Sequence, residues 1–96
     1  YDKSLTRTTP TALSTARSLL AATTVGGYAL FGGGFVSGSE RISTVDAYDD
    51  SLTRTNATDL SAARQELAAI SIGSYALFGG GYDPTYTSTV DVYIVA

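Results

Sequence analysis

The 96-residue sequence contains no cysteine, histidine, methionine or tryptophan. Without cysteine and histidine, the chain cannot form disulfides, zinc sites with Cys and His ligands, Ser-His-Asp triads or Cys-His dyads. We therefore expect no cofactor, no metal site and no catalytic residue set, and we predict that the chain is not an enzyme.

Charged residues are also few, with six Lys and Arg against nine Asp and Glu, which gives a net charge of −3. The basic residues are scattered, whereas a nucleic-acid footprint needs clustered Lys and Arg. No apolar run approaches the roughly 18 to 20 residues of a membrane span. We expect neither a nucleic-acid partner nor a membrane span.

One seven-residue segment, YALFGGG, occurs twice, at Tyr28–Gly34 and again 75 − 28 = 47 positions later at Tyr75–Gly81. A short apolar run that ends in glycines predicts a strand that runs into a tight turn. A repeat of this period is typical of solenoids, propellers and arrays, which usually need roughly three or more units. The chain holds about two units, so other chains or a longer parent protein must supply the missing cover.

Each unit is predicted to contain four short strands, which makes the fold class all-β. The expected strands of the first unit are residues 20–25, 28–33, 44–48 and 51–55. Gly26-Gly27 is expected to form a two-residue hairpin turn. The second unit repeats the first three strands and ends with a strand over 89–95, while residues 5–8 match a fourth strand.

We expect the second strand of each unit to be buried on both faces, and a connecting loop to place one leucine of each unit at the rim of the core. The strand residues are Leu30, Phe31, Leu77 and Phe78, and the rim residues are Leu13 and Leu60.

The repeat resembles the kelch repeat of β-propellers over essentially the whole chain. The matching features are a glycine doublet that closes the second strand, a tyrosine in the third strand, and an arginine before the innermost strand. These residues are Gly32, Gly33, Gly79, Gly80, Tyr48, Tyr93, Arg17 and Arg64. The tryptophan that usually follows the tyrosine in kelch repeats is absent.

The resemblance implies an all-β propeller with blades of four antiparallel strands, two blades per chain. Residues 1–8 are then an outer strand that completes a neighbouring blade, 9–55 form the first blade, and 56–96 form a second blade without its own outer strand. We expect the N-terminal strand to pair beside residues 90–93 of the next chain. Since kelch-like rings usually have six or seven blades, a homotrimer is favoured and a tetramer is second.

The resemblance also implies a non-enzymatic scaffold for binding or assembly, with a protein or glycan as a possible ligand. The loops at residues 35–43 and 82–88 differ in length, which is typical of exposed loops on one face of a repeat protein. Their aromatic residues Phe35, Tyr82 and Tyr86 are the predicted ligand-binding residues.

Several alternatives stay open at this point. One is a lectin-like propeller that binds carbohydrate through these aromatic residues. Another is a structural protein of a bacterial or phage surface, which favours an extracellular, cell-surface or virion location. The chain could also be an excised fragment of a larger propeller, or a designed one.

Two further patterns favour structural roles over chemistry. The glycine runs lack the Gly-Lys-Ser/Thr ending of a phosphate-binding loop, so we expect turns and close backbone packing there. Asp46 recurs as Asp91, and this repetition favours a structural role over a glycosidase that uses paired carboxylates. We expect Arg17 and Arg64 to pair with carbonyls or carboxylates rather than to bind anions.

Overall fold

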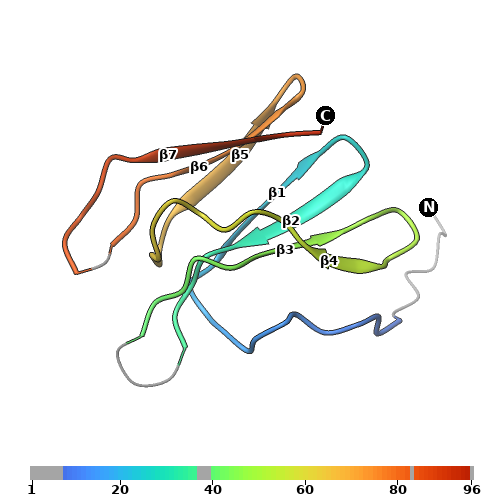
Figure 1. Ribbon diagram of the computed structural model, residues 1–96, viewed down its shortest axis with the longest axis horizontal. Coiled ribbons are helices and arrows are strands. Elements are labelled where there is room, and N and C mark those ends of the chain that lie inside the picture. Colours follow the sequence, from blue (N-terminus) through green and yellow to red (C-terminus); the bar gives the residue numbers. More distant parts are fainter. Residues whose placement is uncertain (1–7, 37–39, 83, 96) are drawn as a thin grey trace, which may run out of the picture.

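The computed structural model describes residues 8–36, 40–82 and 84–95 of the chain. These residues form seven strands in two antiparallel sheets and no helix, and therefore no helix that could cross a membrane (Figure 1). The all-β prediction is confirmed. The first sheet has the order β1-β2-β3-β4, with β1 Ala21–Val25, β2 Tyr28–Gly32, β3 Val45–Tyr48 and β4 Arg54–Asn56. The second sheet has the order β5-β6-β7, with β5 Ala68–Ile72, β6 Tyr75–Gly79 and β7 Val90–Ile94.

Turn chemistry explains how the first hairpin of each sheet closes. Val25 pairs with Tyr28 across the two-residue turn. In this turn Gly26 has φ +55°, whereas Gly27 does not have a positive φ. A positive φ at the first turn position only is the type II′ pattern, which requires glycine there and tolerates other residues next. The second hairpin has the same turn with Gly73 at φ +54°, and Ser74 is accommodated in the second place.

Local backbone geometry shifts several strand ends away from the predicted ones. β2 ends at Gly32 rather than at 33, because Gly33 turns the chain with φ +70°. β4 begins at Arg54 rather than at 51, because the Asp49 carboxylate accepts hydrogen bonds from the backbone N–H groups of Ser51 and Thr53 and holds them in a turn.

Smaller shifts affect the other strands. β1, β3 and β7 begin one residue later than predicted, and β7 ends one residue earlier. The N-terminal strand predicted over 5–8 lies outside the described residues except for Thr8, which belongs to no strand.

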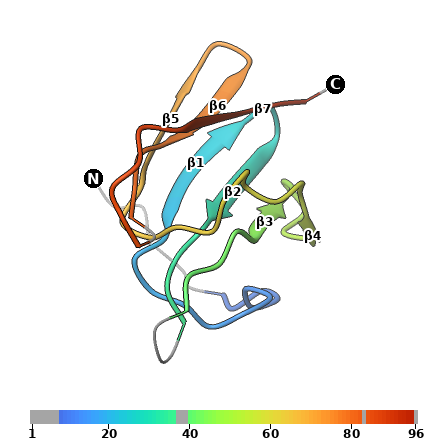
Figure 2. The ribbon, with the colours of Figure 1, turned by 60° about the vertical axis from the view of Figure 1, so that its left-hand side comes forward.

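The two sheets pack against each other, with β1 against β5 and β6 (Figure 2). The core between them is formed by Ala21, Val25, Leu30, Val45, Ala47, Leu60, Leu67, Ala76 and Phe78. Consecutive strand residues point to opposite faces of a sheet. In each sheet, only the face that meets the other sheet is covered. For this reason Leu30 and Phe78 are buried, whereas Phe31 and Leu77, which were also predicted to be buried, are only half-buried. The rim leucines differ too, because Leu60 is buried and Leu13 is half-buried.

Candidate functional site

An Arg–Asp–Ser unit ties each connecting segment to its sheet. In the first unit, Arg17 Nη2 donates to the Phe31 carbonyl at 2.9 Å and to Asp46 Oδ2 at 3.1 Å. The same carboxylate oxygen accepts hydrogen bonds from the backbone N–H and the hydroxyl of Ser14. Both partners of the ion pair are fully buried, so the unit holds the connecting segment in place and offers no open anion site.

The same arrangement recurs in the second unit. Arg64 Nη2 donates to the Phe78 carbonyl at 3.0 Å and to Asp91 Oδ2 at 3.1 Å, and Ser61 donates twice to that oxygen. The two serines were not predicted from the sequence, although Ser14 and Ser61 are also 47 positions apart and could have been found from the repeat.

The two aspartates differ on their outer side. Asn56, on β4, donates to Asp46 Oδ1 at 2.7 Å, and Asp46 is fully buried. In the part of the chain that the structure describes, no strand of the second sheet takes the place of β4, and the Asp91 side chain keeps 18% of its surface exposed. Burial raises the pKa of Asp91, but the hydrogen bonds from Ser61 and the charge and hydrogen bond of Arg64 outweigh it and hold that pKa below its usual value. Asp91 is therefore ionised and paired, but less enclosed than Asp46.

The two repeated tyrosines also have matching surroundings. Tyr48 donates its hydroxyl to the Thr11 carbonyl at 2.8 Å and packs edge-on against Phe31, at 5.8 Å between ring centroids. Tyr93 donates to the Thr58 carbonyl at 2.6 Å and packs edge-on against Phe78, at 5.6 Å. Burial, followed by the charges of Asp91 and Asp59 and opposed by Arg64, raises the pKa of Tyr93 to about 12.

This raised pKa predicts a loss of stability in alkali. Between about pH 10, where an unfolded tyrosine ionises, and about pH 12, the unfolded chain releases the Tyr93 proton while the folded chain keeps it. The free energy of unfolding should therefore fall as the pH rises through this window. Tyr93→Phe should cost about 1 kcal/mol near pH 7, through the lost hydrogen bond, and should remove this part of the alkaline dependence. Urea titrations of both proteins from pH 8 to 12 measure the difference, and parallel curves would contradict the prediction.

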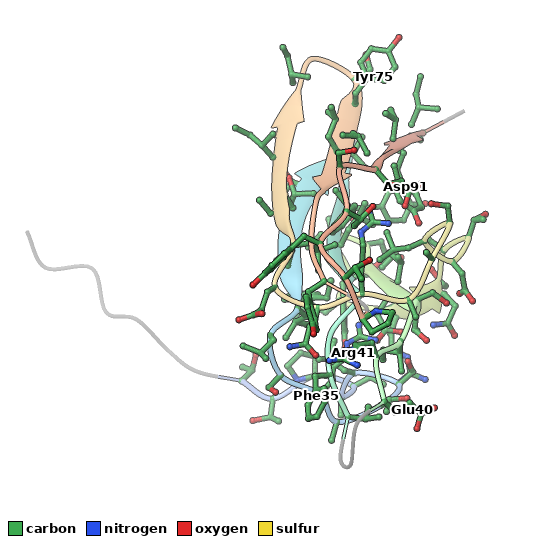
Figure 3. All side chains as sticks on the ribbon, turned by 90° about the vertical axis from the view of Figure 1, so that its left-hand side faces the viewer. Phe35, Glu40, Arg41, Tyr75 and Asp91 are labelled. Atoms are coloured by element: carbon green, nitrogen blue, oxygen red, sulfur yellow. The ribbon has the colours of Figure 1, made fainter. Side chains whose placement is uncertain are left out.

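The three aromatic residues predicted to bind a ligand lie in the loops that follow β2 and β6. Two of them lie beside Arg41, whose guanidinium carbon is 6.0 Å from the Phe35 ring centroid and 5.0 Å from that of Tyr82. Tyr82 also packs edge-on against Tyr86, at 5.2 Å between centroids. Figure 3 shows Phe35 and Arg41 together at the end of the molecule opposite Tyr75. We call Phe35, Arg41, Tyr82 and Tyr86 the loop cluster.

One aromatic ring of the loop cluster is almost fully exposed to solvent. Phe35 and Tyr82 are half-buried next to the guanidinium, whereas Tyr86 is 86% exposed. Arg41 was not predicted from the sequence, because the two loops differ in length. When the loops are aligned from their C-terminal ends, Thr44 matches Thr89 and Arg41 matches Tyr86, so both occupy the same position in their units. Arg41 also donates from Nε to Gln65 Oε1 at 3.0 Å, which links the first loop to the second unit.

The glycine doublets have different neighbours in the two units. A Cβ atom on Gly32 would lie 2.8 Å from Cε1 of Phe78, and one on Gly33 would lie 2.7 Å from the Arg64 carbonyl oxygen. A Cβ on Gly79 would meet only Val90 at 3.4 Å, and one on Gly80 only the Thr87 carbonyl oxygen at 3.7 Å. Gly32 and Gly33 therefore allow close contact with the second unit, whereas the space beside Gly79 and Gly80 is open.

One face of the second sheet is apolar and exposed. We call Ile70, Ile72, Val90, Val92 and Ile94 the open face. In the first sheet, the positions equivalent to Ile72, Val90 and Val92 are covered by the second sheet. Exposure is 67% at Ile72 against 6% at Val25, 53% at Val90 against 0% at Val45, and 53% at Val92 against 5% at Ala47. Large exposed apolar patches of this kind mark interaction surfaces.

Among the described residues, no group of three or more acidic side chains is placed to hold a metal ion. Comparison with known proteins finds no matching protein-family model and no matching curated protein. The assignment of a function therefore depends on the surfaces described above.

Proposed function

We propose that this chain is a non-enzymatic scaffold whose two sheets are kelch-like blades, and that copies of it assemble head to tail into a closed β-propeller. The observation that carries the proposal is the open face, whose equivalent positions in the first sheet are buried by the sheet that follows. Because the two sheets are repeats, the open face of the second sheet should also be covered by a following sheet. The first sheet of another copy can cover it. A contact between different surfaces of identical chains closes into a ring when the rotation permits.

The outer edge of β7 supports the same proposal. In the first sheet, Asp46 pairs with Asn56 and Ala47 with Thr55 on β4. The repeat places Thr9 opposite Asp91 and Thr8 opposite Val92, and both threonines are exposed within the chain. Supplied by a neighbouring copy, this segment would cover the β7 edge, which would otherwise be left to aggregate. Propellers usually have four to eight blades, so three copies with six blades are favoured and four copies with eight come second.

Native mass spectrometry of the 9.9 kDa chain tests the assembly. We expect the mass of three copies, and a monomer at all concentrations would contradict the proposal. Val92→Asp should give monomers, because it would bury an unpaired charge in the contact. Ser71→Asp is the matched control, since Ser71 faces the first sheet and is nevertheless exposed, and it should leave the mass unchanged.

Carbohydrate binding is the second candidate function, favoured by the exposed ring of Tyr86 beside Tyr82. Aromatic rings with one apolar face and a polar tip suit such contacts. A glycan array with the wild-type chain and with Tyr86→Ala tests it. We expect binding that is lost in the variant, and an array without any bound glycan would rule this function out.

A further inference from the structure

The two outer faces of the chain each contain an apolar hollow. Next to the open face, Ala68, Ala69, Ile70, Leu77, Gly79 and Val90 line an apolar hollow. On the far side of the first sheet, Phe31 lies in a second apolar hollow that includes Leu13, Tyr48 and Leu52. The hollow on the second sheet thus contains Gly79, which has no side chain, and the hollow on the first sheet contains the aromatic ring of Phe31.

The contact between the two sheets within the chain shows how such faces fit. The Phe78 ring of the second sheet lies over Gly32 of the first, so close that a Cβ atom on Gly32 would be 2.8 Å from the ring. Beside it, Leu60 and Leu67 approach Gly33, where a Cβ atom would lie 3.2 and 3.0 Å from their methyl groups. An aromatic ring and two leucines from one unit therefore fill the space above a glycine doublet of the other.

Every component of this contact has a half-buried equivalent that lies outside the contact between the two sheets. Phe31 corresponds to Phe78, Leu13 to Leu60 and Leu20 to Leu67, each 47 positions earlier. Each of the two rings also packs edge-on against the repeated tyrosine of its own unit, Tyr48 or Tyr93, at interplanar angles of 87° and 83°. The Phe31 ring is thus held in the orientation that Phe78 uses, without a glycine beneath it. Gly79 and Gly80 correspond to Gly32 and Gly33, and lack the ring and the leucines above them.

We propose that the partner of the open face is a second copy of this chain, which seats Phe31 over Gly79 and Leu13 and Leu20 over Gly80. This interlock rests on the proposed head-to-tail assembly and names the residues that make it. At the loop end, Arg41 reaches over Tyr82 of the following unit, so the equivalent residue Tyr86 meets Phe35 of the second copy. This contact gives the exposed Tyr86 ring a partner.

One hydrogen bond at the outer edge of the first sheet, just beyond the β3–β4 pairs, has no counterpart at the β7 edge between copies. The backbone N–H of Ala57 donates to the Val45 carbonyl at 3.0 Å. The residue 47 positions before Ala57 is Pro10, which has no N–H to donate. Edge pairing between copies therefore lacks one hydrogen bond that the first sheet makes at its own edge. This leaves the apolar interlock, with Phe31 and Gly79, as the part of the contact to test.

Substitutions at Gly79 and Phe31 test the interlock in the whole chain. Gly79→Val adds atoms where the single chain has room, so circular dichroism should show a folded protein. The dissociation constant between copies should rise on the order of thirtyfold or more, which corresponds to the about 2 kcal/mol of an interface hot spot. Phe31→Ala should weaken assembly similarly, and it tests the contact independently if Gly79→Val does not fold.

A double variant separates the interlock from the assembly itself. The double variant Gly79→Leu and Phe31→Ala moves the large side chain from position 31 of one copy to position 79 of the other. It should assemble better than the single variants Gly79→Val and Phe31→Ala. Sedimentation velocity measures all variants. If Gly79→Val and Phe31→Ala both keep the wild-type oligomer and affinity, the interlock is wrong while the assembled scaffold stands. A wild-type monomer overturns both.

Discussion

Replacing Phe78 with alanine should lower the free energy of unfolding by about 3 to 5 kcal/mol, the usual cost of removing a fully buried phenylalanine. Phe78 is 0% exposed and packs against Tyr93 and above Gly32. Gly32 has no side chain that could move into the space left by the ring, so a cavity should remain. A loss of this size is a large fraction of the stability of a small domain.

Tyr75→Ala is the matched control, because it removes an aromatic ring from the same strand at a half-exposed position. We expect a change of about 1 kcal/mol or less there, as for most surface substitutions. Urea unfolding of both variants, at a concentration where the chain is monomeric, gives the comparison. A loss below about 1 kcal/mol for Phe78→Ala would show that β6 is not a core strand.

The repeat made the strands predictable, because each strand signal occurs twice with its turn residues. The errors came from local backbone geometry that strand patterns do not contain. The Asp49 side chain holds residues 51 and 53 in a turn and delays β4. Gly33 leaves the extended conformation and ends β2 early.

Burial could not be predicted from the repeat. Tyr28–Gly34 and Tyr75–Gly81 are identical, yet Leu30 is buried where Leu77 is not, and Phe78 is buried where Phe31 is not. The difference arises from which face has a neighbouring sheet, and this depends on the position of a unit in the array. Arg41 was missed because the two loops differ in length, which hides its correspondence to Tyr86 in the repeat.

The second large effect is expected at Asp46. Asp46→Ala should lower the free energy of unfolding by about 3 to 5 kcal/mol, because it leaves the buried Arg17 guanidinium without its counter-charge. Among the described residues, Arg17 Nε and Nη1 are already buried without a hydrogen-bond partner, as are the same two atoms of Arg64. After the substitution, the Phe31 carbonyl is the remaining acceptor that holds Nη2. The hydrogen bonds from Ser14 and Asn56 to the carboxylate are lost as well.

Asp91→Ala is the matched control, since it removes the same carboxylate from the second unit. Asp91 is partly exposed and has no donor equivalent to Asn56 among the described residues, so water can replace part of what it supplies to Arg64. We expect a clearly smaller loss for Asp91→Ala when both variants are unfolded with urea as monomers near pH 7. Equal losses would mean that enclosure by β4 adds nothing to the Arg17–Asp46 pair. If assembly covers the second unit with Thr8 and Thr9 of a neighbouring copy, the two losses should converge in the oligomer and differ only in the monomer.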